Sequence, residues 1–472
     1  MIQDFAITEI YTDKIDVKKV IRYFSGIPWS VILDSSLHNG DIGRFTIIGF
    51  DPCMFFTSKG YNITIQTGEK SERFTGYPFE FLRSWIKKYE LPPQNDNLPF
   101  HGGCMGYFSY DLVDFIEKIE TKSCDDLQIN DIELGLYNKV IIFDHITDEI
   151  FMIASSIGIR KKILTKTREN LFGIRLLLSD IAKQNQKTDH NIEKVREKNK
   201  IRSNFNKETY MDIVQKAREH IRNGDIFQVN LSQRFEAKIN KTPGELYISL
   251  RECSPAPFCA FLNFDDVKVL SSSPERYLKI DGRYIETRPI KGTRPRGRDK
   301  KSDDMMKREL LESPKERAEL TMIVDLERND LGRICEFGSV NVKSHFVIEE
   351  YANVFHAVSI VTGMIKEGKD IIDCILATFP GGSITGAPKI RAMEIIEEHE
   401  PVKRGIYTGA IGYIGFDGKA DLNIAIRTII IKGNTAYYNV GGGIVWDSVP
   451  EDEYYETLHK GTKMLEVLTG GQ

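Results

Sequence analysis

Short stretches in which apolar and polar residues alternate dominate the N-terminal third of the chain. They include SVILDSS, RFTIIGFDP, YNITIQTG and KVIIFDHITDEIFMIAS, and Gly, Asp or Asn punctuates them. Successive side chains of a strand point to opposite faces of a sheet, so a period of two predicts β-strands. The punctuating residues predict turns, and we therefore expect antiparallel hairpins in this region.

The rest of the chain mixes helical and strand patterns. KETYMDIVQKAREHIRNGD (207–225) and GAPKIRAMEIIEEHE (386–400) place apolar residues at helical spacing, and a glycine stop follows the first of them. PFCAFLNF, KVLSSS and AYYNVGGGIVWDS have the composition of strands. These elements lack the strand–helix–strand rhythm of a parallel sheet, so we predict an α+β fold with large antiparallel sheets.

One segment separates these two regions. Between residues 182 and 210 apolar residues become scarce while lysine and asparagine accumulate, which favours a solvated helix end followed by a linker. We therefore divide the sequence into an N-terminal region (1–181), a linker (182–205) and a C-terminal region (206–468). A length of 472 residues suits two domains or one large interwoven domain.

Composition and charge narrow the classes of partner. Hydrophobic residues make up 41% and charged residues 28% of the chain, and the net charge is −4. This balance provides no basic field for nucleic acid or an acidic membrane, so we expect small molecules or proteins as partners. The start MIQDFAITEIYTDK lacks a signal-peptide pattern, and no uncharged run approaches the ~20 residues of a membrane helix. We expect a cytoplasmic protein.

The cysteines show no paired spacing. We expect free thiols, as in a reducing compartment, rather than a disulfide framework or a zinc site. The seven cysteines are Cys53, Cys104, Cys124, Cys253, Cys259, Cys335 and Cys374.

A basic stretch, ETRPIKGTRPRG (286–297), places Lys291 among Arg288, Arg294 and Arg296, with a glycine directly after the lysine. One interpretation is a solvated basic loop. The other is a catalytic lysine, because neighbouring cations disfavour the ammonium form and free the amine to act as a nucleophile. The stretch alone leaves both open.

Gly102, Cys104 and Gly106 in HGGCMGYFSYDL follow the G-x-C-x-G pattern on which glutamine amidotransferases mount their thiol nucleophile. Such a thiol needs a histidine oriented by an acid, and the usual late His-Pro-Glu element is missing. His399 precedes Glu and Pro in the wrong order. We therefore expect Cys104 to lie in a tight strand turn, with glutaminase chemistry as the alternative.

Carboxylates gather in two predicted helices. Glu316 and Glu319 lie one helical turn apart, and Glu453, Glu456 and Lys460 share one face near the C-terminus. Taken singly, each run predicts a solvated face. Taken together, one carboxylate from each helix could hold Mg²⁺, a hard ion that accepts a few carboxylates plus water.

The C-terminal helix itself has a predicted start. Ser448 and Glu451 form a capping-box pattern, so we expect the helix to begin there. Its predicted apolar face consists of Tyr454, Leu458, Leu465 and Leu468.

A glycine-rich loop, FPGGSITGAPK, runs into a predicted helix with Pro388 in its first turn. Unpaired backbone N–H groups at a helix start can bind an anion, and a helix cap without a ligand is the alternative. The glycines of VGGGIV (441–443) offer a second exposed backbone of this kind.

These motifs occur together, in one order. GDIFQVNLSQRF, SSSPERY, TRPIKGTRPRG, KERAEL, DLERNDLGR, FHAVS, PGGSITGAPK, RGIYTGAIGY, IAIRT and GGGIVWDS precede EYYETLHK. In this the chain resembles the chorismate-utilising enzymes over nearly its whole length, specifically the large subunit of anthranilate synthase and its sister, component I of aminodeoxychorismate synthase. The resemblance implies a sandwich of large antiparallel sheets flanked by helices, with a chorismate-binding catalytic domain at 206–468.

The resemblance also implies roles. Glu319 and Glu456 correspond to ligands of a Mg²⁺ cofactor that holds the ring carboxylate of chorismate, with Glu316 and Glu453 nearby. Glu275 corresponds to the general acid or base that assists departure of the C4 hydroxyl. Further substrate-binding positions implied by the resemblance, several of them around the enolpyruvyl carboxylate, are Thr293, His356, Thr385, Tyr407, Arg427, Gly442, Gly443 and Lys460.

Two positions separate the sister activities. Relatives that add water to chorismate carry lysine where this chain has Gln228. Anthranilate synthases typically read PIAGT where this chain reads PIKGT, as aminodeoxychorismate synthases do. The implied mechanism attaches Lys291 to C2 and adds ammonia at C4, giving 4-amino-4-deoxychorismate for 4-aminobenzoate and folate biosynthesis. Anthranilate synthase component I, of tryptophan biosynthesis, is the alternative.

Partners follow from the same resemblance. Ammonia would come from a separate glutaminase subunit in a heterodimer. Asp34, Ser35 and Ser36 correspond to an amino-acid pocket of some relatives. An alternative of another class is an inactive regulatory or amino-acid-binding partner subunit, which would have broken acid and metal positions.

Overall fold

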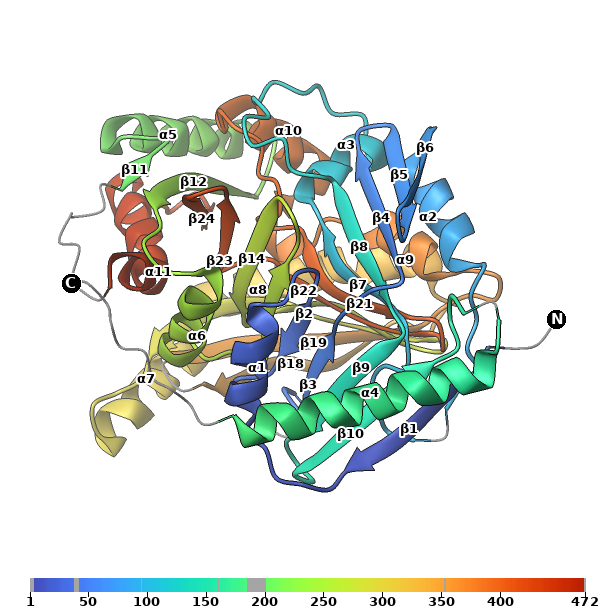
Figure 1. Ribbon diagram of the computed structural model, residues 1–472. Coiled ribbons are helices and arrows are strands. Elements are labelled where there is room, and N and C mark those ends of the chain that lie inside the picture. Colours follow the sequence, from blue (N-terminus) through green and yellow to red (C-terminus); the bar gives the residue numbers. More distant parts are fainter. Residues whose placement is uncertain are drawn as a thin grey trace.

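The computed structural model describes residues 4–37, 42–94, 96–159, 161–184, 201–351 and 354–470. Two antiparallel sheets of twelve strands each form the body of the molecule, and helices lie on their outer faces (Figure 1). The predicted α+β sandwich is therefore confirmed.

The first sheet draws its strands from both ends of the sequence. β2 (Val31–Asp34) pairs with β13 (Phe258–Asn263), so strands from before and after the segment 182–205 lie in one sheet. Residues 185–200 of the predicted linker lie outside the described residues. The remaining strands, in spatial order around that pair, are β1 (Ala6–Tyr11), β10 (Glu149–Ser155), β9 (Lys139–Asp144) and β3 (Phe45–Gly49) on one side and β14 (Val267–Ser273), β23 (Thr428–Lys432), β24 (Thr435–Ile444), β12 (Gln228–Lys238) and β11 (Arg202–Ser203) on the other, with β20 (Gly386–Ala387) also pairing with β12.

The second sheet is mixed in the same way. β7 (Gly103–Phe108) pairs with β21 (Ala410–Gly415), which joins the two sequence regions again. On one side of that pair follow β8 (Ile132–Tyr137), β4 (Met54–Lys59), β5 (Asn62–Thr67) and β6 (Lys70–Thr75), and on the other β22 (Lys419–Ile424), β15 (Arg276–Asp281), β16 (Tyr284–Arg288), β19 (Val354–Met364) and β17 (Ile290–Pro295), with β18 (Asn341–Glu350) also pairing with β19.

Helices cover the outer faces because each presents one apolar stripe. Side chains of α1 (Val17–Ser25), α4 (Ile163–Lys183), α6 (Pro243–Cys253) and α11 (Pro450–Thr469) share one buried cluster with the first sheet. Those of α2 (Pro78–Ile86), α8 (Pro314–Ile334) and α9 (Ile371–Thr378) share another with the second. The other helices are α3 (Val113–Ile116), α5 (Lys207–Asn223), α7 (Lys300–Glu312) and α10 (Lys389–His399), with 3₁₀ turns at Tyr110–Leu112 and Gly382–Ile384.

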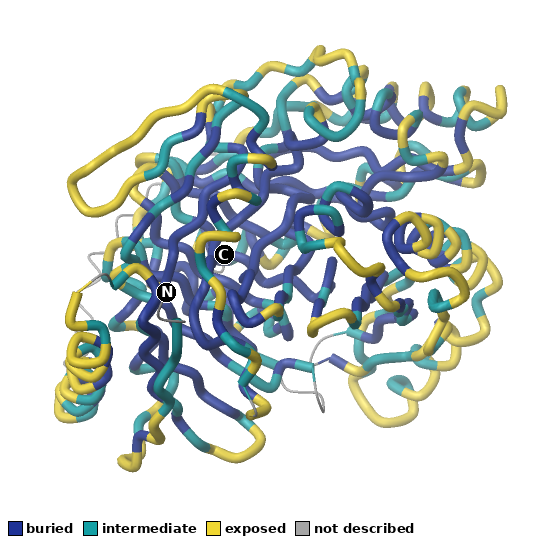
Figure 2. The backbone as a smooth tube through the Cα atoms, turned by 90° about the vertical axis from the view of Figure 1, so that its right-hand side faces the viewer, coloured by how far each residue is buried: buried dark blue, intermediate teal, exposed yellow. Residues whose placement is uncertain are grey.

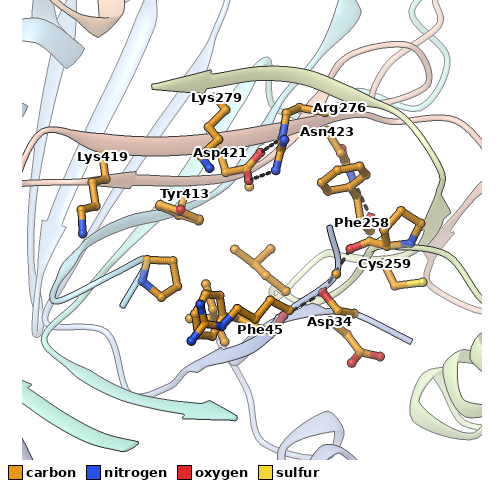
Figure 3. Close-up of a pocket in the computed structure, with 18 of the residues that line it drawn as sticks. Asp34, Phe45, Phe258, Cys259, Arg276, Lys279, Tyr413, Lys419, Asp421 and Asn423 are labelled. Carbon is orange, nitrogen blue, oxygen red and sulfur yellow. Dashed lines mark hydrogen bonds and ion pairs between the residues drawn. The ribbon is translucent and has the colours of Figure 1, made fainter. Parts of the chain in front are cut away.

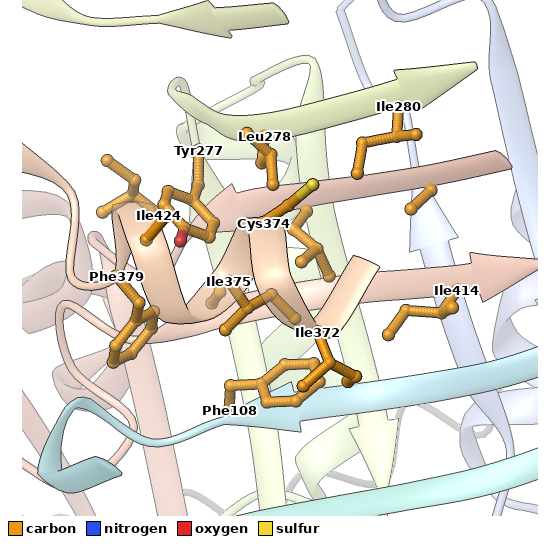
Figure 4. Packing of buried hydrophobic residues seen from close by; sticks show 14 of the residues in the cluster. Phe108, Tyr277, Leu278, Ile280, Ile372, Cys374, Ile375, Phe379, Ile414 and Ile424 are labelled. Atoms are coloured by element: carbon orange, nitrogen blue, oxygen red, sulfur yellow. The ribbon is translucent and has the colours of Figure 1, made fainter. Parts of the chain in front are cut away.

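Buried residues fill the interior of the molecule, and exposed residues lie on the outer helices and loops (Figure 2). Ile142 and Leu262 of the first sheet share a buried cluster with Met105 and Ile411 of the second, so the two sheets enclose a common core. On the far side of the second sheet, α9 packs side chains such as Ile375 into its own cluster (Figure 4). Removing this apolar area from water is the main favourable contribution to folding.

Most predicted elements are confirmed. The four N-terminal patterns form β2, β3, β5 and the β9–β10 hairpin, and α5 ends at Gly224 with a left-handed φ of 82° that glycine adopts without strain. The prediction for Cys104 was wrong, because this residue lies fully buried inside β7 rather than in a turn.

The C-terminal helix is also different from its prediction. It begins at Pro450, and Val449 at the cap position makes no side-chain hydrogen bond. The predicted capping box does not form, because the Ser448 hydroxyl donates to Glu453 at 2.6 Å instead. The buried residues of the helix are Glu453, Thr457, Gly461, Met464, Val467 and Leu468. Leu468 of the predicted apolar face is confirmed, whereas Tyr454, Leu458 and Leu465 are only partly buried. At α10, Pro388 stands at the cap position rather than in the first turn.

Candidate active site

A cavity of about 180 Å³ lies where the ends of both sheets meet. Its lining includes Lys291 of β17, His356 of β19 and Gly443 of β24, so both sheets contribute. A neighbouring cavity of about 530 Å³ shares part of this lining, including Arg427 and Lys460. Most of the predicted site residues therefore come together in one place although they are spread over more than two hundred positions of the sequence.

Lys291 lies on a strand rather than on a turn. Its strand slips register against β19 between Lys291 and Thr293, where Gly292 takes a left-handed φ of 82°. The lysine is half-buried, and its Nζ lies 3.4 Å from the position that a Cβ on Gly443 would occupy. Because Gly443 has no side chain, the amine reaches the cavity wall.

The pKa of Lys291 is lowered, chiefly because burial disfavours the charged amine, with Lys460 adding to the effect and Glu319 opposing it. The sequence suggested that the flanking arginines would lower it. They do not, because each arginine is paired with a carboxylate: Arg288 with Glu349, Arg294 with Glu309 and Arg296 with Asp303.

Glu275 supplies an acid beside this lysine. It is buried, and its Oε1 accepts a hydrogen bond of 3.1 Å from the backbone N–H of Ile290, the residue before Lys291. Burial raises the pKa of Glu275 to about 7. The carboxyl can therefore hold or release a proton near neutral pH.

Several buried side chains have polar atoms without partners among the described residues, and Gln228 and His356 are two of them. The amide oxygen and nitrogen of Gln228 and the Nε2 atom of His356 have no hydrogen-bond partner among the described residues. The other nitrogen of His356 bonds the Thr293 hydroxyl at 2.9 Å. Burial, aided by Arg427, lowers the pKa of His356 to about 3, so its ring is neutral. Buried polar atoms are normally paired, so these mark a place for a polar ligand.

Arg427 provides a positive charge at the cavity. It lines both cavities, and within the described part of the chain no carboxylate lies within ion-pairing distance of its guanidinium. Tyr407 lines the smaller cavity, and its hydroxyl lies 3.0 Å from the Cβ position of Gly441. A guanidinium beside a phenol and an open glycine backbone suits a ligand carboxylate.

The acidic residues of α8 and α11 face this site. A Cβ on Gly442 would lie 3.0 Å from Glu453 Oε2 and 3.6 Å from Glu456 Oε1, so the glycine leaves room beside them. Lys460 pairs with Glu456 at 2.7 Å and donates to the carbonyl of Gly441 at 3.0 Å. Burial raises the pKa of Glu453, and at Glu456 it is opposed by Lys460, which leaves the pKa lowered.

On α8 the two candidate ligands differ in their partners. Glu316 is neutralised by Arg294 at 3.2 Å, whereas the nearest cation paired with Glu319 is Lys315, at 4.0 Å. Burial raises the pKa of Glu319, and Glu456 adds to this effect, so the two carboxylates influence one another. Among the described residues, these four glutamates do not bring three donor atoms within 4.8 Å of one another.

Three of the predicted substrate-binding residues, Gln228, Thr385 and Gly442, are not in the lining of either cavity, and Thr385 is turned to the protein backbone. Its hydroxyl donates to the carbonyl of Gly381 at 3.0 Å.

Sequence reasoning missed Asn439, which lines the cavity and has a buried Oδ1 without a partner among the described residues. It also missed Glu327, whose Oε1 accepts from the N–H of Gly382 at 2.9 Å. A polar residue two positions before the Gly441–Gly443 run was the available signal for Asn439.

A separate cavity of about 180 Å³ lies between β2, β3 and β13 of one sheet and β15, β21 and β22 of the other (Figure 3). Asp34 and Ser35 line it, and Ser36 does not. The Asp34 carboxylate already pairs with Arg251 at 2.5 Å and accepts from Thr46 at 2.8 Å. Asp34 and Ser35 thus help to shape this cavity, while its basic lining includes Lys279 and Lys419.

Cys104 shows none of the features of a nucleophile. Burial raises the pKa of its thiol well above the ordinary value, and the side chain lies in the apolar cluster under α9. All seven cysteines are free thiols. No helix in the described part of the chain is long and apolar enough to cross a membrane.

A buried acid, a half-buried lysine and an arginine without an ion pair among the described residues surround one cavity of this α+β sandwich, which suits an enzyme that acts on a small carboxylate. The chain belongs to the family of chorismate binding enzymes, whose model matches residues 43–466. The resemblance inferred from the ordered motifs is therefore confirmed.

Relatives within this family carry two different names. Anthranilate synthase component 1 of Aquifex aeolicus (strain VF5) is 38% identical over 99% of this chain and 95% of its own length. Aminodeoxychorismate synthase component 1 of Bacillus subtilis (strain 168) is 38% identical over 90% of this chain and 89% of its own. The crystal structure of anthranilate synthase component I from Streptococcus pneumoniae TIGR4 matches with a TM-score of 0.78 at 31% identity, over 91% of this chain and 93% of that one.

Proposed function

We propose that the chain aminates chorismate at C4, giving 4-amino-4-deoxychorismate for 4-aminobenzoate and folate biosynthesis, as component I of an aminodeoxychorismate synthase. The observation that carries the proposal is Lys291: a half-buried amine with a lowered pKa, in the same cavity as Glu275 and Arg427. A neutral amine is a nucleophile, and this one occupies the position that distinguishes C4 from C2 amination in the resembled enzymes.

The proposed reaction has two displacements. The Lys291 amine forms a bond to C2 while the C4 hydroxyl departs, and the proton of Glu275 goes to that hydroxyl so that water leaves. Ammonia then forms a bond to C4 and the lysine nitrogen leaves C2 as the free amine. The extra proton of the new C4 ammonium group goes to the Glu275 carboxylate, which restores both residues. Burial of Glu275 and Lys291 favours the neutral form of both groups, as the first step requires.

Side chains around the cavity would orient the substrate. Arg427, with Tyr407 and the backbone of Gly443, is suited to the enolpyruvyl carboxylate because its guanidinium has no protein carboxylate as partner among the described residues. The free amide of Gln228 beside Gly443 can bond ammonia or a ring substituent. Neutral His356 presents an unpaired nitrogen to the same space.

Mg²⁺ is the proposed cofactor, and the donor set is compatible with it. Glu319 and Glu456 would hold the ion, with Glu453 beside them and room left by Gly442. A Mg²⁺ site with one or two protein carboxylates is usual when water and substrate complete the coordination, which suits glutamates that do not converge as a closed cage. When bound, the ion would offset the charge of the ring carboxylate.

Nitrogen supply is proposed to come from a separate glutaminase subunit in a heterodimer. The buried Cys104 supports this, because a thiol without access to solvent cannot attack glutamine. For the cavity at Asp34 we propose an amino-acid ligand; its mixture of a buried carboxylate, lysines and an arginine suits a zwitterion.

Anthranilate synthase component I is the second candidate. It is favoured by the 38% identity to the Aquifex aeolicus relative over almost the whole of both chains. The two reactions share the fold and differ in the carbon that receives nitrogen. Incubation of the chain with chorismate, Mg²⁺ and an ammonium salt separates them. Aminodeoxychorismate without fluorescent anthranilate supports our proposal, and anthranilate as the main product refutes it.

A further inference from the structure

Two histidines and a glutamate meet at the ends of two helices, away from the chorismate cavity. His220 lies in the last turn of α5, and Glu398 and His399 end α10. One ligand atom from each of the three lies within 4.8 Å of the other two, and the rings of His220 and His399 are 6.1 Å apart. In the part of the chain that the structure describes, no other group of three such side chains is this close.

We propose that His220, Glu398 and His399 form a binding site for a divalent transition metal of the zinc type. Two imidazoles and one carboxylate are a donor set that suits Zn²⁺, with water as the fourth ligand. Imidazole donors favour Zn²⁺ and its neighbours over Mg²⁺, which prefers oxygen ligands. The site is therefore chemically distinct from the glutamates at the chorismate cavity.

The hydrogen bonds of the two histidines leave one ring nitrogen of each open to a metal. Nδ1 of His220 is bonded to the carboxylate of Asp225 at 2.8 Å, so Nε2 remains for a metal. A carboxylate on the far nitrogen is the usual way in which proteins orient a metal-binding histidine. Nε2 of His399 is buried and has no hydrogen-bond partner among the described residues. An unpaired buried nitrogen needs a partner, and a metal would supply one.

Glu398 can adjust to complete the site. It is exposed, and its ion pairs with Lys122 and Arg391 are long, at 3.9 and 3.5 Å. Arg391 keeps a shorter pair with Glu394 at 2.7 Å if Glu398 turns away. Bonds to zinc of about 2.0–2.2 Å place tetrahedral donors about 3.4 Å apart, so donor atoms that lie within 4.8 Å of one another must close by at most about 1.4 Å. A side chain at a helix end can make that movement.

The metal site would join α5 and α10, the helices that adjoin β12 and β20. α5 leads through Gly224 into β12, which begins with Gln228, and α10 follows β20, which pairs with β12 (Figure 1). A metal between the ends of α5 and α10 would cross-link them. Because it binds the folded chain, it should raise the unfolding temperature.

The test measures metal binding directly. The full chain is freed of metal with EDTA, returned to buffer with excess Mg²⁺ to fill oxygen sites, and titrated with Zn²⁺ by calorimetry and thermal unfolding. We expect one equivalent that raises the unfolding temperature, and loss of that equivalent in His220→Gln/His399→Gln. The matched control is His345→Gln, an exposed histidine of β18 elsewhere in the fold, which should keep it.

Two further measurements guard against misreading. Asp225→Asn keeps all three ligands and should lower the affinity by about 10- to 100-fold, the usual effect of losing the carboxylate behind a ligating histidine. Co²⁺ should give visible bands of a nitrogen- and oxygen-ligated ion without thiolate charge transfer, since seven free cysteines are the competing ligands. The proposal is overturned if the double variant binds Zn²⁺ with unchanged stoichiometry, or if the Co²⁺ spectrum shows thiolate ligation.

Discussion

Gly443→Ala should damage the site without damaging the fold. An alanine Cβ there would lie 2.9 Å from Nε2 and 3.2 Å from Cδ of Gln228, and 3.4 Å from Nζ of Lys291. Ordinary carbon contacts are about 3.5–4.0 Å, so the amide must retreat by roughly 0.5–1 Å. Misplacing reacting groups by 1 Å can lower a rate by about 10²-fold. We expect kcat/KM to fall by about 10- to 100-fold, or about 1.4–2.8 kcal/mol of transition-state stabilisation.

The fold should tolerate this change because the atoms that must move are the ends of side chains. The Gln228 amide has no hydrogen-bond partner to lose among the described residues. The assay is steady-state amination with chorismate, Mg²⁺ and ammonium, alongside a thermal melt. Gly332→Ala is the matched control: it lies in α8, and a Cβ there meets nothing within 4 Å. Its kinetics should be unchanged, and a kcat/KM of Gly443→Ala within twofold of the parent would refute the placement of Gln228 and Lys291.

Three further predictions concern metal, protons and nitrogen. Glu319→Ala or Glu456→Ala should abolish Mg²⁺-dependent activity while the far-ultraviolet circular dichroism and unfolding temperature stay near those of the parent, and full activity of the parent in EDTA would contradict the metal proposal. Burial raises the pKa of Glu275 from 4.5 to about 7, so the folded chain binds this proton more tightly than the unfolded chain. Protonated Glu275 thus contributes up to about 3 kcal/mol to the free energy of unfolding below about pH 4.5, and this contribution is lost as the pH rises to 7. In urea denaturation, Glu275→Gln should therefore lose less stability than the parent over that range. The isolated chain should use ammonium and not glutamine, and Cys104→Ala should keep its kcat with ammonium; glutamine turnover by the chain alone would argue against a partner glutaminase.

Much of the fold could be predicted because its determinants are local. The alternation in RFTIIGFDP and the glycine after α5 specify a strand and a helix end regardless of what packs on them. The predicted start of α11 was wrong because the Ser448 hydroxyl donates to Glu453, an acceptor that is not part of the capping pattern. The prediction that Cys104 lies in a turn was wrong for a similar reason. Its flanking glycines allow close strand pairing, since a Cβ on Gly106 would lie 2.0 Å from the carbonyl oxygen of Glu133.

At the site, too, residue types could be predicted from the sequence, whereas the contacts formed by packing could not. The residue types around Lys291 and Glu275 were predictable from ordered motifs, whereas the cause of the lowered lysine pKa was not. Neighbours in sequence suggested arginine charges, but the arginines are paired with carboxylates of α7 and β18, and burial dominates. The meeting of His220 with His399 likewise depends on how α5 and α10 pack, which no local pattern contains.

The central claim is that Lys291 is a nucleophile, and mass spectrometry of the chain incubated with chorismate and Mg²⁺, without ammonia, tests it most directly. The peptide containing Lys291 should gain the mass of chorismate less one water, and Lys291→Ala should lose this adduct and shift its product towards C2 amination. Lys291→Arg should be inactive because a guanidinium stays protonated. An unmodified Lys291 in the parent, together with undiminished aminodeoxychorismate formation by Lys291→Ala, would contradict it.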